Sequence, residues 1–259
     1  MIGRGTASME KPSLEIITSV EQANDCISLI GGYETEFDVD EAARRIVQFF
    51  DFQYFVFGAL YRNGEQEHYR YIFGCAPEWC YLYIQNKWYA IDPFIGYALK
   101  NSSPILASDI PLTSPGQRRM MASASEYGFR SGIVVPAHSA SSNWIGLLHL
   151  GTDEGLDCAQ RSLDAHRNLM RAFGLELLEW FDSRLHDNSV SDLDLDKLDL
   201  KLLCKAQEHA TAAEAARELG ITLALAESRY RRLYRKLDVP AKRHAVDKAV
   251  ELGLIRSLL

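Results

Sequence analysis

Residues Thr211–Val239 read TAAEAARELGITLALAESRYRRLYRKLDV. An alanine-rich segment of helical character leads to Gly220, and a longer segment rich in arginine follows. Glycine allows a sharp change of direction, and Thr222 can cap the second helix by accepting a hydrogen bond from a free backbone amide. The stretch therefore predicts two helices joined by a tight turn, the arrangement of a helix-turn-helix.

The second helix of this pair is suited to the major groove of a DNA duplex. From Thr222 to Leu237 it would be about 24 Å long at 1.5 Å per residue. Its expected inward residues are Leu225, Tyr230, Leu233, Tyr234 and Leu237. Its basic residues, expected to face largely outward, are Arg229, Arg231, Arg232, Arg235 and Lys236. An ordinary solvated face is the alternative interpretation of these charges.

The residues toward the N-terminus predict a mixed α and β region. Helical spacing over 39–50 is followed by strand-like runs at 52–61 and 69–73, separated by the turn-forming pair Asn63-Gly64. A helix over 118–127 ends at Gly128, strands at 132–137 and 144–150 form a second hairpin, and a long amphipathic helix covers 159–181. We expect an α+β protein with an N-terminal α/β/α sandwich on an antiparallel sheet, followed by an all-α four-helix helix-turn-helix domain.

Composition supports two domains of different charge. The chain of 259 residues has a net charge of −7, yet Lys and Arg outnumber Asp and Glu after Val190. The polar, acidic stretch between Arg184 and Asp199 is the best candidate for a boundary. We expect a sensor domain at 1–185, a linker at 186–195 and a DNA-binding domain at 196–259.

Other features exclude several classes of protein. The five cysteines are scattered and form no CxxC pair, so neither a disulfide framework nor a zinc site is expected, and no metal or cofactor is predicted. No apolar run is long enough to cross a membrane, and the first residues lack a signal peptide. The expected location is the cytoplasm, without membrane contact.

Two segments carry a resemblance to a known family. The run YRKLDVPAKRHAVDKAVELGLI at Tyr234–Ile255, preceded by TAAEAARELGIT, resembles the DNA-binding domain of LuxR-type regulators. The run EWCYLYIQNKWYAIDPFIGYA at 78–98 resembles the acyl-homoserine-lactone-binding domain of the same family, and FRSGIVVP supplies the familiar Gly132. The chain is thus identified as a member of the LuxR-type quorum-sensing regulators, with an expected function in sensing a lactone and controlling transcription.

The resemblance implies particular site residues. For DNA these are Thr222, Leu223, Ala224, Glu227, Arg229, Arg231, Arg232, Arg235, Lys242 and Arg243. We expect base contacts from Leu223, Ala224, Glu227 and Arg231, and phosphate contacts from Arg232, Arg235, Lys242 and Arg243. For the ligand, Asp92 would accept from the amide N–H, Trp79 would donate to the lactone carbonyl, and Tyr83 would complete the site.

Some positions depart from the family pattern. Cys75 stands where a tyrosine that binds the acyl carbonyl is common, Ala107 where a second tryptophan usually closes over the lactone, and His149 near a position usually held by Ser or Thr. In the other domain, Asp199 replaces a longer Glu, and His209 and Glu227 are also unusual. These changes indicate an orphan receptor whose ligand specificity is altered, broadened or lost, or one that acts without a ligand.

The resemblance also implies partners. They are double-stranded DNA with a palindromic operator and a second copy of the chain, with RNA polymerase and related regulators as further candidates. We expect the homodimer to form through the helices at 159–181 and 244–252, whose apolar faces have no obvious partner within the chain.

Two other functions compete with this interpretation. One is an enzyme with Cys75 or Cys80 as nucleophile and His68 or His149 as base, although no motif requires these residues to converge. The other is a modulator that pairs with related regulators and binds DNA weakly or not at all, as the changes at Asp199, His209 and Glu227 suggest.

Overall fold

A computed structural model describes residues 16–63, 66–139 and 144–255, with backbone only at 62, 63 and 66–68. Its centre is a five-stranded sheet in the order β2-β1-β5-β4-β3, in which all neighbouring strands are antiparallel. The strands are β1 (Tyr54–Asn63), β2 (Gln66–Gly74), β3 (Ile105–Leu106), β4 (Ser131–His138) and β5 (Trp144–Thr152). The expected pairs β1–β2 and β4–β5 are confirmed, while Gly64 and residues 140–143 of the two turns lie outside the described residues.

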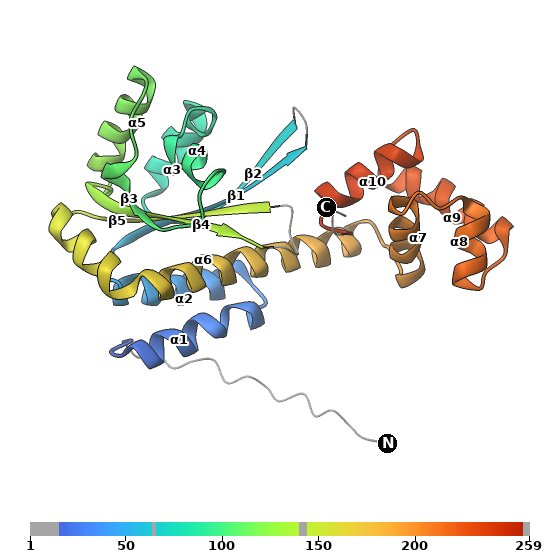
Figure 1. Ribbon diagram of the computed structural model, residues 1–259, viewed down its shortest axis with the longest axis horizontal. Coiled ribbons are helices and arrows are strands. Elements are labelled where there is room, and N and C mark those ends of the chain that lie inside the picture. The colour runs from blue at the N-terminus through green and yellow to red at the C-terminus, as the bar shows by residue number, and fades with distance from the viewer. Residues whose placement is uncertain (1–15, 64–65, 140–143, 256–259) are drawn as a thin grey trace.

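Helices cover both faces of the sheet (Figure 1). One face carries α2 (Glu36–Phe49) and α6 (Leu156–Asp192), with α1 (Val20–Ser28) behind them and the short helix η1 (Ile30–Gly32) between α1 and α2. The other face carries α3 (Pro77–Gln85), α4 (Pro93–Ala98) and α5 (Pro115–Glu126), with the short helices η2 (Trp88–Ala90) and η3 (Ala107–Asp109). The expectation of an α+β protein with an antiparallel sheet is confirmed.

The alternation of strand side chains supplies the main core. Phe57, Leu148 and Val135 lie opposite one another on β1, β5 and β4, and all three are buried. They belong to the same core cluster as Phe173 and Leu177 of α6. Successive residues of a strand point to opposite faces of the sheet. The residues next to these three along each strand therefore point to the face that carries α3–α5.

The long helix α6 differs from the prediction in two ways. Its apolar face packs on β4 and β5, so the expectation that this face lacks a partner within the chain is wrong. At Gly174 an added Cβ would already lie 3.5 Å from Val135 Cγ1, which shows how closely the helix crosses the sheet. The helix also continues well beyond Phe181, through most of the expected linker at 186–195.

The helical continuation is explained by tertiary contacts. His186 Nδ1 lies 2.8 Å from the carbonyl oxygen of Gly253, and a Cβ added at that glycine would lie 3.5 Å from Leu185 Cδ2. Val190 packs on the core of the C-terminal region. These contacts stabilise a polar segment that would be marginal as an isolated helix.

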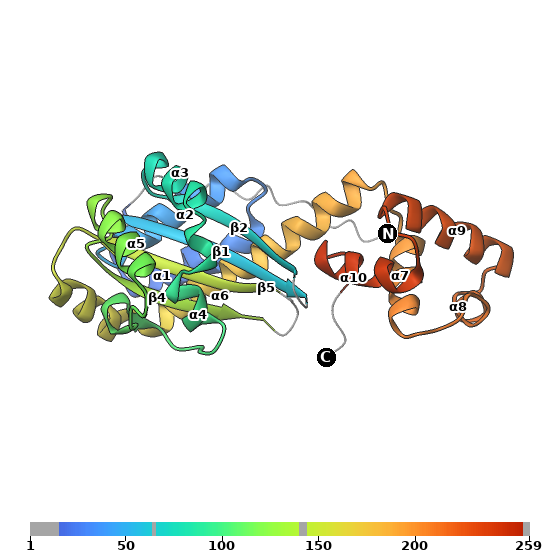
Figure 2. The same ribbon diagram turned by 90° about the horizontal axis from the view of Figure 1, so that it is seen from above.

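The C-terminal region is helical and has its own core, as expected. Its helices are α7 (Lys197–Gln207), α8 (Ala212–Leu219), α9 (Leu223–Lys236) and α10 (Lys242–Glu251). Gly220 has a φ of 66° between α8 and α9, and the Thr222 side chain accepts from the Leu225 amide, so the predicted turn and cap are both confirmed. Figure 2 shows this region beyond the end of α6.

Two details of this region correct the prediction. Leu225 is 40% exposed, and Ala226 takes its place in the core. The apolar residues of α10 are also covered, since Ala245 and Ala249 are fully buried within the chain. Among the described residues, no helix is long and apolar enough to cross a membrane.

Shortening Leu148 should weaken the packing of α6 on the sheet. This side chain is fully buried, so Leu148→Ala should lower the free energy of unfolding by about 2–5 kcal/mol in urea titrations. Leu156→Ala is the matched control, because Leu156 is 47% exposed at the start of α6 and its loss should cost less than about 0.5 kcal/mol. Equal losses in the two variants would contradict the packing described here.

Candidate functional site

A cavity lies between the sheet and the helices α3–α5. The empty space among its lining residues amounts to about 730 Å³ when the open solvent at its mouth is included. Its floor is a grid of nine residues in three rows on β2, β1 and β5: Tyr69, Leu60 and Ile145; Tyr71, Gly58 and Leu147; and Phe73, Val56 and His149. Each row joins residues more than 70 positions apart in the chain. These residues are therefore brought together by the pairing register of the strands and not by their closeness in sequence.

The polar end of the cavity is formed by Asp92. This residue caps α4, and its Oδ1 accepts a hydrogen bond of 2.8 Å from the Phe94 amide. Its Oδ2 accepts a second bond of 2.8 Å from the Tyr83 hydroxyl. Burial raises the pKa of the Asp92 carboxyl to about 6, although both hydrogen bonds favour the charged form.

Two aromatic residues of α3 lie beside this carboxylate. Trp79 and Tyr83 are four residues apart, so they share one face of the helix, and both are buried in the cavity wall. The Trp79 ring lies against Trp88 at a centroid distance of 5.4 Å. The indole N–H of Trp79 has no hydrogen bond within the described part of the chain. The three residues singled out by the sequence therefore meet at one cavity.

His149 lies on the floor of the same cavity. Its ring packs between Phe94 and Phe129, at centroid distances of 4.7 and 4.8 Å. Burial lowers the pKa of this imidazole to about 3, so the ring is neutral at physiological pH. Close packing here also explains Gly132, where an added Cβ would lie 2.3 Å from the Leu150 carbonyl oxygen.

The other two residues expected in the ligand set lie elsewhere. Cys75 is absent from the cavity lining, and its sulfur lies 3.6 Å from the sulfur of Cys80. Ala107 borders a separate depression together with Phe129 and Arg130. The enzyme hypothesis gains no support from this geometry, because within the described residues the Cys75 thiol contacts Cys80 rather than His149. The side chain of His68 lies outside the described residues.

Sequence reasoning missed Tyr71. Its hydroxyl is buried and makes no hydrogen bond of good geometry with the described residues. Its ring lies over Gly58, where an added Cβ would be 3.2 Å from Tyr71 Cε1, and it meets the ring of Tyr83 edge-on at 5.8 Å. Burial raises the pKa of this hydroxyl, so it remains a donor. The spacing of tyrosines in β2 indicates that Tyr69 and Tyr71 share a face of the strand. The pairing of Tyr71 with Gly58 is what places the Tyr71 side chain in the cavity.

The second candidate site is the exposed face of α9. Ala224, Glu227, Arg231 and Arg235 are exposed and spaced by three or four residues, so they form one stripe along the helix. Leu223 at the start of α9 and Arg243 at the start of α10 are also exposed. Neither Arg231 nor Arg235 has an ion pair with a described residue.

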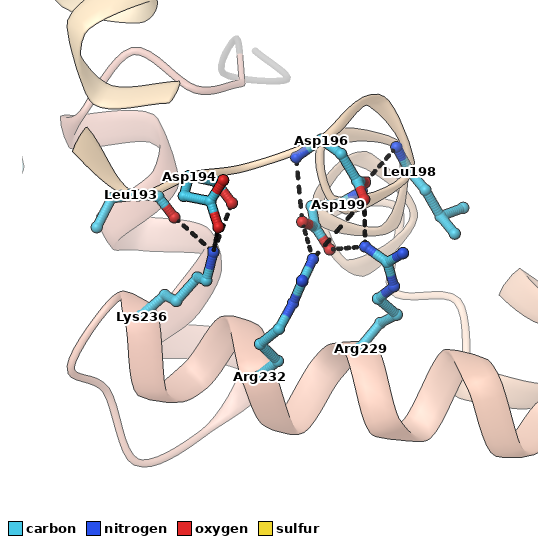
Figure 3. A network of polar contacts seen from close by, with 8 residues as sticks. All are labelled: Leu193, Asp194, Asp196, Leu198, Asp199, Arg229, Arg232 and Lys236. Atoms are coloured by element: carbon cyan, nitrogen blue, oxygen red, sulfur yellow. Dashed lines mark hydrogen bonds and ion pairs between the residues drawn. The ribbon is translucent and has the colours of Figure 1, made fainter. Parts of the chain in front are cut away.

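Four other basic residues make contacts within the protein, and for Arg229, Arg232 and Lys236 this corrects the prediction that they point largely outward (Figure 3). Arg229 and Arg232 both donate to the fully buried Asp199 of α7, with 3.1 Å between Arg229 Nη1 and Asp199 Oδ1. Lys236 Nζ donates to the Leu193 carbonyl oxygen at 2.7 Å, and Lys242 Nζ donates to that of Ala210. These four cations are held by groups of the C-terminal region or, for Lys236, by the end of α6 and the residue after it.

The arrangement of Asp199 follows from a capping box at the start of α7. The Asp196 side chain accepts from the Asp199 amide, and the Asp199 side chain accepts from the Asp196 amide. Each carboxylate thereby reaches Arg229 as well. A buried carboxylate requires such partners, because an unpaired charge away from water is strongly destabilising.

Comparison with known proteins identifies the family. Residues 35–179 match the autoinducer binding domain family, which includes every lining residue of the cavity. The chain belongs to the LuxR-type regulators. Over 196 residues it is 26% identical to the quorum-sensing-dependent transcriptional regulator RpaR of Rhodopseudomonas palustris, covering 71% of this chain and 74% of RpaR.

Solved structures of LuxR-type regulators share the fold. SdiA of Escherichia coli matches with a TM-score of 0.67 at 17% identity, covering 91% of this chain and 98% of SdiA. SdiA in complex with octanoyl-rac-glycerol matches with a TM-score of 0.66 at 16% identity, covering 94% of this chain and all of that one. The likeness extends over both the sheet region and the C-terminal helices.

Asp92 and His149 should change the pH dependence of stability in opposite directions. The imidazole of His149 resists protonation because the cavity removes it from water, so stability is lost as the pH falls from 6.5 toward its folded pKa of about 3. The pKa of the Asp92 carboxyl is raised for the same reason, so its contribution favours the folded state at low pH and is lost as the pH rises through about 6.

Urea titrations at pH 6.5 and 5.0 test this opposition. Relative to the unmodified protein, His149→Gln should lose about 1.5 kcal/mol less stability on acidification, and Asp92→Asn about 1 kcal/mol more. Comparing each variant with the unmodified protein removes the background from other titrating groups. Parallel pH profiles for all three proteins would contradict the opposite pKa shifts of the two residues.

Proposed function

We propose that this LuxR-type regulator binds DNA through α9 and senses an acyl-homoserine lactone in the cavity under α3–α5. The observation that carries the ligand part is a carboxylate, Asp92, at the end of a cavity whose lining is otherwise mainly apolar and aromatic. Such cavities bind small molecules by enclosing an apolar body and fixing its orientation with a few polar groups.

The polar groups match the chemistry of an amide joined to a lactone. Asp92 would accept from the amide N–H, since each carboxylate oxygen has a lone pair beyond the one used by Phe94 or Tyr83. The indole N–H of Trp79 would donate to the lactone carbonyl. The Tyr71 hydroxyl, buried without a good partner, would donate to the acyl carbonyl in place of the tyrosine that Cys75 replaces.

The apolar lining suits the acyl chain of the ligand. Leu147, Leu99, Ile95 and Met121 surround the remainder of the cavity. SdiA is a precedent for a fold of this kind holding an acyl compound, octanoyl-rac-glycerol. One ring nitrogen of the neutral His149 would form a hydrogen bond with a polar atom of the ligand. The ligand specificity would therefore differ from that of a regulator with Ser or Thr at this position.

The DNA part of the proposal rests on the turn at Gly220 and the stripe on α9. The helices α8 and α9 would act as a helix-turn-helix within a four-helix domain, with Leu223, Ala224, Glu227 and Arg231 facing bases. Arg235 and Arg243 would contact phosphates. The domain would begin after Leu193, where α6 ends and the second core starts. Two copies would bind a palindromic operator in the cytoplasm.

A specific observation favours a second candidate, a modulator that pairs with related regulators. Arg229, Arg232, Lys236 and Lys242 are held within the chain, and Glu227 places a negative charge on the stripe itself. A carboxylate near the phosphate backbone opposes binding unless it accepts from a cytosine amino group.

Calorimetric titration with octanoyl-homoserine lactone and with its ester analogue, which lacks the amide N–H, tests the ligand site. The unmodified protein should bind the amide about 10–100 times more tightly, because the ester covers the Asp92 carboxylate without donating a hydrogen bond to it. Asp92→Asn should remove most of this preference. Asp109→Asn, which changes an exposed carboxylate, should preserve it. Equal affinity for the two compounds in the unmodified protein would contradict the role of Asp92.

Gel-shift titrations with operator DNA over a range of salt concentrations test the surface of α9. Arg231→Ala should weaken specific binding about tenfold or more and relax base preference, and Arg235→Ala should weaken all binding and lower the salt slope by about 1. Arg161→Ala, an exposed arginine on α6, is the control and should bind as the unmodified protein does. If no salt-dependent binding occurs with any sequence, the pairing modulator is the better account.

A further inference from the structure

Cys75 and Cys80 form a pair of thiols next to the ligand cavity. Their sulfur atoms lie 3.6 Å apart, and both side chains are half-buried rather than sealed in the core. Cys75 follows the last residue of β2, and Cys80 lies near the start of α3. Within the described part of the chain, the other three cysteines, Cys26, Cys158 and Cys204, have no such sulfur contact.

The two thiols differ in acidity. The hydrogen bond between the sulfurs lowers the pKa of Cys80 and raises that of Cys75. The Cys80 sulfur also lies 3.4 Å from the Ala76 carbonyl oxygen at the start of α3. Cys80 is thus the sulfur that ionises first, with Cys75 as a neighbouring thiol in contact with it.

We propose that Cys75 and Cys80 form a reversible disulfide that responds to hydroperoxides and alters the ligand cavity. The Cys80 thiolate attacks the O–O bond of a hydroperoxide, which releases an alcohol or water after protonation and leaves a sulfenic acid on Cys80. The Cys75 sulfur then attacks the Cys80 sulfur, and the sulfenic oxygen leaves as water. Two thiols and one hydroperoxide give one disulfide, one alcohol and one water, and a reducing dithiol restores the thiols by exchange.

The disulfide would act on the cavity through α3. Forming the bond shortens the separation of the sulfurs from 3.6 Å to about 2.0 Å, so the first turn of α3 must shift relative to the end of β2. Trp79 directly precedes Cys80, and Tyr83 lies less than one turn beyond it. Both line the cavity, so oxidation changes the position of two of its walls. This effect on ligand affinity rests on the proposed function, whereas formation of the disulfide does not.

Mass spectrometry of the full chain tests the disulfide directly. The protein is treated with stoichiometric hydrogen peroxide at pH 7, alkylated with iodoacetamide and digested with trypsin. Both thiols lie in one tryptic peptide, residues 71–87. This peptide should escape alkylation and be about 2 Da lighter than the free dithiol, for the loss of two hydrogens, while Cys26, Cys158 and Cys204 are still alkylated. Dithiothreitol should reverse the change.

Variants separate this reaction from general thiol oxidation. Cys75→Ser should stop at a sulfenic acid on Cys80, which dimedone traps, and Cys158→Ser should behave as the unmodified protein does. Cys204 is exposed and serves as an internal comparison. Oxidation of Cys204 with Cys75 and Cys80 still fully alkylated would overturn the proposal.

Ligand titration tests the effect on the cavity. Oxidation should weaken binding of octanoyl-homoserine lactone at least tenfold in the unmodified protein and leave that of Cys75→Ser unchanged. Unchanged affinity of a protein shown to hold the disulfide would overturn the link to the cavity. If the reduced protein binds no lactone, the proposed ligand fails, while the mass measurement still decides whether the disulfide forms.

Discussion

The packing of α6 on the antiparallel sheet is the contact on which the rest of the structure depends. The helix covers one face of β4 and β5 with Phe173, Leu177 and their neighbours, and this leaves the opposite face to α3–α5 and the cavity. The same helix continues to Asp192 and delivers the chain to the C-terminal core. Because its hydrogen bonds are continuous between the two regions, a change in how α6 lies on the sheet is carried to the position of the helices beyond it.

The cavity shows how stability and recognition compete in one place. Removal from water disfavours charged groups, so the pKa of the Asp92 carboxyl is raised and that of the His149 imidazole is lowered. Tyr71 adds a buried hydroxyl without a good partner. A buried polar group without a hydrogen-bond partner destabilises the empty protein. Binding of a molecule with a complementary group removes that cost.

Periodicity and turn residues predicted most of the fold, whereas details that depend on distant partners were not accessible. The strands around 52–61 and 132–137 stand out as short runs rich in apolar and β-branched or aromatic residues, but β3 has two residues and leaves no pattern. The continuation of α6 depends on contacts with Gly253, and the inward orientation of Arg229 and Arg232 depends on Asp199, about 30 residues earlier. Trp79, Tyr83 and Asp92 could be grouped because one short segment carries them. Tyr71 could not, because its place is set by strand register.

Gly58 at the centre of the cavity floor sets a limit of a different kind. At this point the wall consists of backbone, and the ring of Tyr71 already occupies the space that a side chain would need. The floor is therefore as deep as an antiparallel sheet permits. A substitution at Gly58 can only make the cavity shallower. A related protein that binds bulkier molecules would therefore need changes in the helices above the sheet.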